Sequence, residues 1–159
     1  MGSNLGDRPV NLEMAVERLK MNVTFDQVSS LYETDPVGFE DQPAFVNAAA
    51  SGGTDLPPEE LLKFIKGVEL SAGRVETVLN GPRVLDIDIL LFGVGKPPSG
   101  AVIMRTPNLT IPHPRMHERA FVLIPLTEIE PLLTHPVLDR NMRDLAREVG
   151  SKGVRKLLS

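Results

Sequence analysis

Two carboxylates, Asp86 and Asp88, stand two positions apart in the run GPRVLDIDILLF, Gly81 to Phe92. The rest of the run is mostly apolar and predicts a β-strand, in which alternate side chains share a face. The Cα atoms of the two aspartates would then lie about 6.6 Å apart, at roughly 3.3 Å per residue. Mg²⁺ takes carboxylate ligands together with substrate phosphates, and a pair of such ions can clamp a phosphoryl group in transfer. The spacing therefore indicates metal-assisted phosphoryl chemistry.

The alternative for this pattern is the solvent-facing polar side of an ordinary strand. Two features favour the metal site. The apolar residues 90–92 are typical of a central strand, where a carboxylate without a partner is costly to bury. Arg83 follows a rigid Gly81-Pro82 turn, from which it can present a cation beside the aspartates.

A second cluster of chemical groups lies in LTIPHPRMHERAF, residues 109–121. His113 is held between two prolines, and Arg115 and Arg119 follow it. Arginine forms bidentate contacts with phosphate oxygens, so this cluster suits a polyphosphate. A structural histidine with surface arginines is the alternative. A zinc site at His113 and His117 is disfavoured, because no H-E-x-x-H pattern is present and proline separates the two histidines.

The N-terminal stretch GSNLGDRPVN, Gly2 to Asn11, reads as a turn that leads into a helix. Its amide groups could bind an anion. Turn formation and helix capping explain the same residues and are favoured on spacing alone. Neither a P-loop nor a G-x-G-x-x-G motif occurs, so a nucleotide site would belong to another type.

Composition limits the classes of protein that need to be considered. The chain has 159 residues, 42% of them hydrophobic and 24% charged, with a net charge of −4. These values predict one domain over residues 1–159 and argue against extensive nucleic-acid binding. There is no cysteine, no apolar run of membrane-spanning length and no secretory signal pattern. We therefore expect a cytoplasmic protein without a membrane partner.

Helix and strand signals alternate along the chain. The elements that they predict must position the aspartates, the histidine and the arginines described above. Helical spacing of apolar residues follows Asp7, a potential N-cap, and recurs over DLPPEELLKFIKGVELSAGR and from Arg140 to Val149. Strands are predicted at Val23–Tyr32, AFVNAAAS and Val84–Phe92. HERAFVLIPLTEIEP reads as a helix or a buried turn and helix, interrupted at Pro125, and residues 150–159 as a loose tail. This order predicts a sheet covered by helices in one α/β or α+β domain.

Five motifs together resemble one family, 6-hydroxymethyl-7,8-dihydropterin pyrophosphokinase of folate biosynthesis. They are GSNLGDR, SSLYETDPVG, DQPAFVNA, GPRVLDIDILLF and LTIPHPRMHERAFVLIPL, and they occur in the family's order. The resemblance implies an α+β, ferredoxin-like αβα sandwich, with an antiparallel-rich sheet and helices on both faces. It also implies transfer of pyrophosphate from ATP to the pterin hydroxymethyl group, with two Mg²⁺ ions and release of AMP.

The resemblance assigns roles to particular residues. Asp86 and Asp88 would hold the metals, and together with Arg83 they would form the catalytic set. The nucleotide would be contacted by Arg74, Arg83, His113 and Arg119. The pterin pocket would comprise Thr34, Pro36, Val37, Phe45, Asn47 and Phe121, with the two phenyl rings sandwiching the pterin and Asn47 reading its edge. Other enzymes of folate synthesis would be potential partners.

Three departures from the family pattern carry expectations of their own. No hydrophobic strand precedes GSN, which predicts a truncated first strand. The loop GRVETVLNGPR offers Glu76 and Asn80 where relatives commonly place arginine, aromatic or basic residues. The connector GVGKPPSGAVIMRTP is longer than usual and reads as a surface insertion. These departures keep one alternative open, a degenerate paralogue that binds Mg-ATP or pterin without efficient transfer. If the resemblance is set aside, a ferredoxin-like interaction domain without chemistry is a further alternative.

Overall fold

The computed structural model describes residues 1–73, 81–93 and 100–158. Arg74, for which a nucleotide contact is predicted, and the loop residues Glu76 and Asn80 lie outside the described residues. In chain order the elements are β1 (Gly2–Ser3), α1 (Arg8–Leu19), β2 (Thr24–Val28), β3 (Tyr32–Thr34), β4 (Phe45–Asn47), β5 (Ala50–Gly53), α2 (Pro58–Ser71), β6 (Met104–Arg105), β7 (Thr110–Ile111), the 3₁₀ turn η1 (Met116–Glu118), α3 (Ala120–Ile129), β8 (Thr134–His135), β9 (Arg140–Asn141), α4 (Met142–Val149) and β10 (Val154–Lys156). This mixture of helices and antiparallel strands confirms the α+β class.

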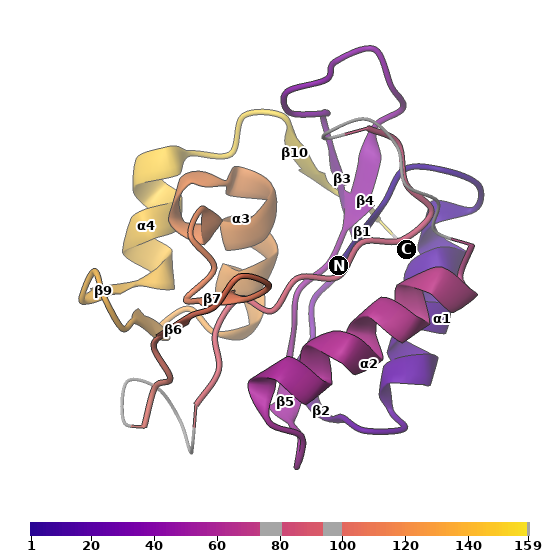
Figure 1. Cartoon of the computed structure of the whole chain (residues 1–159). Coiled ribbons are helices and arrows are strands. Elements are labelled where there is room, and N and C mark those ends of the chain that lie inside the picture. Colours follow the sequence, from indigo (N-terminus) through magenta and orange to yellow (C-terminus); the bar gives the residue numbers. More distant parts are fainter. Residues whose placement is uncertain (74–80, 94–99, 159) are drawn as a thin grey trace.

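The central sheet has the strand order β1-β4-β3-β10, and every pair in it is antiparallel. Strands β2 and β5 pair with each other, with a register shift between Phe25 and Gln27. They are the outer ends of the chain segments that form β3 and β4, so one long bent hairpin runs through the molecule (Figure 1).

Helices cover both faces of the strands. In Figure 1, α1 and α2 lie together on one side, and α3 and α4 lie together on the other. Alternate side chains along residues 46–49 point to opposite faces of the sheet. Val46 and Ala48 pack in the core under α1 and α2, whereas Ala49 packs in the core under α3 and α4. The sheet therefore carries a separate apolar core on each face.

Helix α1 begins as the sequence predicts. The Asp7 side chain accepts a hydrogen bond from the Val10 amide, and a proline occupies the first turn, where no intrahelical amide is needed. Of the apolar residues at helical spacing, Leu12, Ala15 and Leu19 are buried and Val16 is partly buried. The turn before α1 thus serves as a cap.

The strand predicted at Val84–Phe92 is not a regular strand. Within residues 1–73, 81–93 and 100–158, one isolated bridge joins it to the sheet, between Asp86 and Gly2. Next to this bridge the Asn4 amide donates to Arg83 O at 3.1 Å. Side chains add further pairing: the Arg83 amide donates to Asn4 Oδ1 and the Ile87 amide to Glu69 Oε1. The alternation of faces survives, since Leu85 and Ile87 are buried while Asp88 is exposed.

Two further segments differ from the predictions. Helix α3 runs through Pro125 without interruption, from Ala120 to Ile129. The region predicted to be a loose tail contains β10, which pairs with β3 from Val154↔Thr34 to Lys156↔Tyr32. Among the described residues, no helix has the length and apolar character needed to cross a bilayer.

Candidate active site

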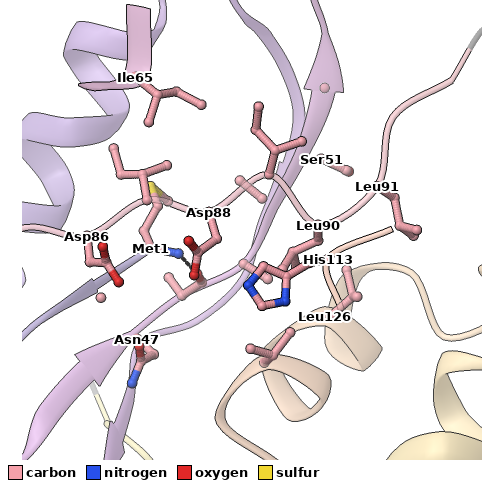
Figure 2. A pocket seen from close by; sticks show the side chains of 18 of the residues that line it. Met1, Asn47, Ser51, Ile65, Asp86, Asp88, Leu90, Leu91, His113 and Leu126 are labelled. Carbon is pink, nitrogen blue, oxygen red and sulfur yellow. Dashed lines mark hydrogen bonds between the residues drawn. The ribbon is translucent and has the colours of Figure 1, made fainter. Parts of the chain in front are cut away.

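A cleft of ≈ 1400 Å³ opens beside the sheet and collects groups from distant parts of the chain. One wall comes from the 83–93 segment, another from β4 and β5, and a third from the 113–126 region. Figure 2 shows Asp86 and Asp88 projecting into this space from one segment, with His113 approaching from another. The side chains that the sequence analysis singled out from separate motifs therefore share one cavity.

The two aspartates differ in their surroundings. Asp86 is partly buried, and its carboxylate forms an ion pair with Arg83, with 2.8 Å between Nη1 and Oδ2. Asp88 is exposed to the cleft. A carboxylate that is open to solvent retains its full acceptor capacity for a ligand. The pair thus offers one site that is already neutralised by an arginine and one that is available.

Cationic groups face the aspartates across the cleft. Burial lowers the pKa of His113, while the charge of Asp88 opposes this shift and that of Arg119 adds to it. Burial, together with the charge of Arg115, also lowers the pKa of Arg119, against the effect of the two aspartates. A lowered pKa keeps His113 neutral near pH 7, so that it can act as a hydrogen-bond partner, whereas arginine keeps its charge. Positive charge at this wall therefore comes from arginine.

The face of the central sheet that opens to the cleft carries three of the predicted pterin-binding residues. Thr34 lies opposite Phe45 in the β3–β4 register, and Asn47 lies two residues beyond Phe45, so all three side chains share a face. The Asn47 amide Nδ2 donates to Thr34 Oγ1 at 2.6 Å. Both polar side chains are at most 8% exposed, so this pair has a fixed orientation.

Phe121 extends this wall from the first turn of α3. Its ring lies 5.5 Å from the guanidinium carbon of Arg119, within the range of a cation–π contact. Phe121 lines the same cleft as Phe45. The aromatic and cationic parts of the cleft are therefore adjacent at the start of one helix.

The predicted residues are not equally well placed. Arg83, Asp86, Asp88, His113, Arg119, Thr34, Val37, Phe45, Asn47 and Phe121 all line the cleft. Val37 is 60% exposed. Pro36 is not among the described lining residues, and Arg74 lies outside the described part of the chain.

Sequence reasoning missed several residues that shape the cleft. Gly2 is one: a Cβ added there would lie 2.5 Å from Asn47 Oδ1, so this glycine leaves room for the asparagine amide. Asn4 is another, since its Nδ2 donates to Gln42 Oε1 and Pro43 O while its Oδ1 accepts from the Arg83 amide. The sequence GSN indicated a turn. The folded chain shows in addition that Asn4 connects the loop at Gln42 and Pro43 to Arg83.

The fit of the cleft to magnesium rests on Asp86 and Asp88. Within the described residues, no group of three or more histidine, cysteine or acidic side chains is gathered to hold a metal ion. A pair of carboxylates nevertheless suits Mg²⁺, which keeps water and binds substrate phosphates in place of a full set of protein ligands. The residues therefore fit an ion that arrives with a polyphosphate, and they do not form a preassembled cage.

Comparison with known proteins identifies the family. The family model described as 7,8-dihydro-6-hydroxymethylpterin-pyrophosphokinase (HPPK) matches residues 1–131. The chain belongs to this family, whose enzymes transfer pyrophosphate from ATP to hydroxymethyldihydropterin in folate synthesis. The resemblance read from the motifs is thereby confirmed.

Individual relatives agree with this assignment. The chain is 48% identical over 131 residues to the 2-amino-4-hydroxy-6-hydroxymethyldihydropteridine pyrophosphokinase of Bacillus subtilis, covering 81% of this chain and 74% of that protein. It is 45% identical over 137 residues to the folic acid synthesis protein FOL1 of Dictyostelium discoideum, covering 86% of this chain. That alignment spans only 20% of the Dictyostelium protein.

A solved structure supports the fold. It is described as HPPK-DHPS in complex with substrates, and it matches with a TM-score of 0.66 at 16% sequence identity. The match covers 92% of this chain and 42% of that one. At this identity the likeness concerns the fold alone.

Proposed function

We propose that this chain transfers the β,γ-pyrophosphoryl group of ATP to the hydroxymethyl oxygen of 6-hydroxymethyl-7,8-dihydropterin. The observation that supports this most directly is the single cleft that joins a carboxylate pair, a cationic wall and an aromatic wall. A phosphate-bearing ligand suits the first two walls. A flat polar ring suits the third, because aromatic side chains favour stacked neighbours.

In this reaction the substrate hydroxyl oxygen attacks the β-phosphorus of ATP. The new O–P bond forms as the bond between the β-phosphorus and the α,β-bridging oxygen breaks, AMP leaves, and the hydroxyl proton passes to solvent. Such in-line displacement needs positioning and charge neutralisation more than a protein nucleophile. Arg83 and Arg119 would hold and neutralise the phosphates in this role, and neutral His113 would add a hydrogen bond to them. Arg74 is proposed to join them.

Asp86 and Asp88 would hold two Mg²⁺ ions together with the phosphate oxygens. Bound there, magnesium would offset the charge of the triphosphate and of the two carboxylates. Support comes from the exposure of Asp88 to the cleft, which Arg115 and Arg119 also line. Because Asp86 is paired with Arg83, it would have to share or give up this contact in order to hold an ion.

The pterin is proposed to lie over β3 and β4. Asn47 and Thr34 would read its polar edge, and Phe45 and Phe121 would stack on its faces. Val37 and Pro36, in the loop after β3, would complete the pocket. The Asn47–Thr34 hydrogen bond supports this placement, since a buried amide with a fixed orientation can discriminate between donors and acceptors.

Two broader proposals accompany the reaction. We assign the three-layer arrangement to the ferredoxin-like type, supported by helices on both faces of an antiparallel sheet. We also propose that other folate-synthesis enzymes take up the product, because a pterin carrying a diphosphate leaving group is suited to a following substitution. The longer Dictyostelium relative, named for folic acid synthesis, is consistent with such neighbours.

A product assay tests the proposed reaction. Protein, MgCl₂, ATP and 6-hydroxymethyl-7,8-dihydropterin are incubated, and AMP is resolved from ADP. We expect pterin-dependent AMP, and we expect D86A or D88A to abolish it while folding is retained. ADP as the product, or wild-type turnover in either variant, would refute the reaction or the metal assignment respectively.

A further inference from the structure

Glu69 is a buried carboxylate to which the proposed reaction gives no role. It lies in the last turns of α2 and is 1% exposed, beside core residues such as Val68. A charged group is costly to bury unless hydrogen bonds or an opposite charge compensate it. A buried Glu69 therefore requires a hydrogen bond or an opposite charge that compensates its carboxylate.

The contacts of Glu69 include a backbone hydrogen bond and an ion pair. Its Oε1 accepts a hydrogen bond of 2.7 Å from the Ile87 amide, and its Oε2 lies 2.9 Å from Lys66 Nζ. Ile87 stands between Asp86 and Asp88 and is itself 5% exposed. The carboxylate therefore binds the backbone at the midpoint of the aspartate pair.

The Ile87 amide needs this acceptor because the segment that carries it is not a regular strand. Asp86 exchanges both backbone hydrogen bonds with Gly2, at 2.8 Å each, and β1 extends only to Ser3. A buried backbone amide without an acceptor costs free energy comparable to a lost hydrogen bond. Without Glu69 the peptide between the aspartates would rotate or shift toward water.

We infer that Glu69 is a positioning residue that fixes the Asp86–Asp88 peptide, and thereby the geometry in which the two carboxylates meet metal-bound nucleotide. This inference rests on the proposed metal role of the two aspartates. Side chains that orient metal-binding groups without touching the ion typically change metal affinity by about 10–100-fold when they are replaced. We expect an effect of that size.

The test measures binding of Mn²⁺ with α,β-methylene-ATP, a nucleotide that cannot release AMP, by electron paramagnetic resonance without pterin. E69M removes the acceptor at similar side-chain length, and Mn²⁺ affinity should fall by about tenfold or more. E69Q retains an acceptor oxygen and should recover affinity to within about threefold of wild type. Hydrogen exchange of the Ile87 amide, measured without nucleotide, should accelerate in E69M and recover in E69Q.

Matched controls separate positioning from stability. K66M removes the partly exposed cation but keeps the Ile87 contact, so it should leave Mn²⁺ affinity nearly unchanged. V68A creates a cavity in the same helical turn and should lower Tm without altering Mn²⁺ affinity. If E69M does not fold, E69D provides the test, because its carboxylate is one methylene too short to reach the amide.

The outcomes are distinct. A folded E69M or E69D with wild-type Mn²⁺ affinity would overturn the inference, as would a loss of affinity in V68A equal to that in E69M. If wild-type protein binds no Mn²⁺ nucleotide, the proposed function fails. In that case the hydrogen-exchange rate of the Ile87 amide alone decides whether Glu69 fixes the Asp86–Asp88 peptide. An unchanged exchange rate in folded E69M or E69D would refute that role.

Discussion

Adding a single methyl group at Gly2 should impair recognition of the pterin without touching the ligand. In G2A the new Cβ would lie 2.5 Å from Asn47 Oδ1, whereas ordinary contact begins at 3.4 Å. The amide must therefore move by about 3.4 − 2.5 = 0.9 Å. A shift of this size disrupts its 2.6 Å hydrogen bond with Thr34 and misdirects the group that we propose reads the pterin edge.

The magnitude follows from the hydrogen bonds at stake. A buried hydrogen bond left unmade costs about 1–3 kcal/mol, and each 1.4 kcal/mol corresponds to a factor of about ten in affinity. The Kd of the pterin should therefore rise by about tenfold or more in G2A. The assay is a fluorescence titration of the pterin in the presence of Mg²⁺ and α,β-methylene-ATP, with nucleotide affinity measured separately and expected to change little.

The control is G67A, on the exposed side of α2. A Cβ there meets nothing within 4 Å, so it should bind pterin normally and gain up to about 1 kcal/mol of stability from helix propensity. Wild-type pterin affinity in a folded G2A protein would refute the reasoning, because it would show that Asn47 either moves freely or does not read the ligand.

Three further predictions concern other parts of the cleft and its frame. F121A should weaken pterin binding by roughly 1–2 kcal/mol from lost stacking and burial, with little change in Mg-ATP binding, and unchanged pterin affinity would remove Phe121 from the pocket. N4L should cut the links from Asn4 to Pro43 and to the Arg83 amide, and should lower kcat/KM by about tenfold, as steady-state AMP release would show. Burial alone would raise the pKa of Glu128, but hydrogen bonds from Tyr32 and Ser30 lower it to about 2 from 4.5, so its stabilising effect is complete above pH 4.5 and is lost as the pH falls toward 2. E128Q should therefore cost about 1–2 kcal/mol in urea unfolding at pH 7, after allowance for solvent screening of this partly exposed group, and much less near pH 2; an equal cost at both values would contradict the assignment.

Local patterns were sufficient to predict α1, α2 and the family. The capped start of α1 and the apolar stripe of α2 follow from residue spacing, and the motifs identified the family before any fold was known. The aspartate pair was correctly expected to project from one face while Leu85 and Ile87 enter the core. These features depend on near neighbours in the sequence, which is why they could be read there.

The errors involve partners that are distant in sequence. The 84–92 run has the composition of a strand, but whether it pairs depends on partners elsewhere in the chain, and among the described residues one bridge joins it to the sheet. The last residues contain small and charged side chains typical of a tail, yet β3 offers an open edge and β10 occupies it. Glu69 and Asn4 likewise acquire their roles from contacts 18 and 79 residues away.

The two halves of the cleft are held in register by a single glycine. Gly2 is the Cα partner of Asn47 on one side and bridges Asp86 on the other, so these three residues form a row across neighbouring chains. With about 4.8 Å between adjacent strands, the backbones of Asn47 and Asp86 lie roughly 10 Å apart. The backbones that carry the proposed pterin-reading amide and the proposed metal-binding carboxylate are thus separated by two strand spacings, a distance set by backbone hydrogen bonds. A side chain at the middle of that row would displace the amide, which explains why the shortest strand of the sheet contains a residue without one.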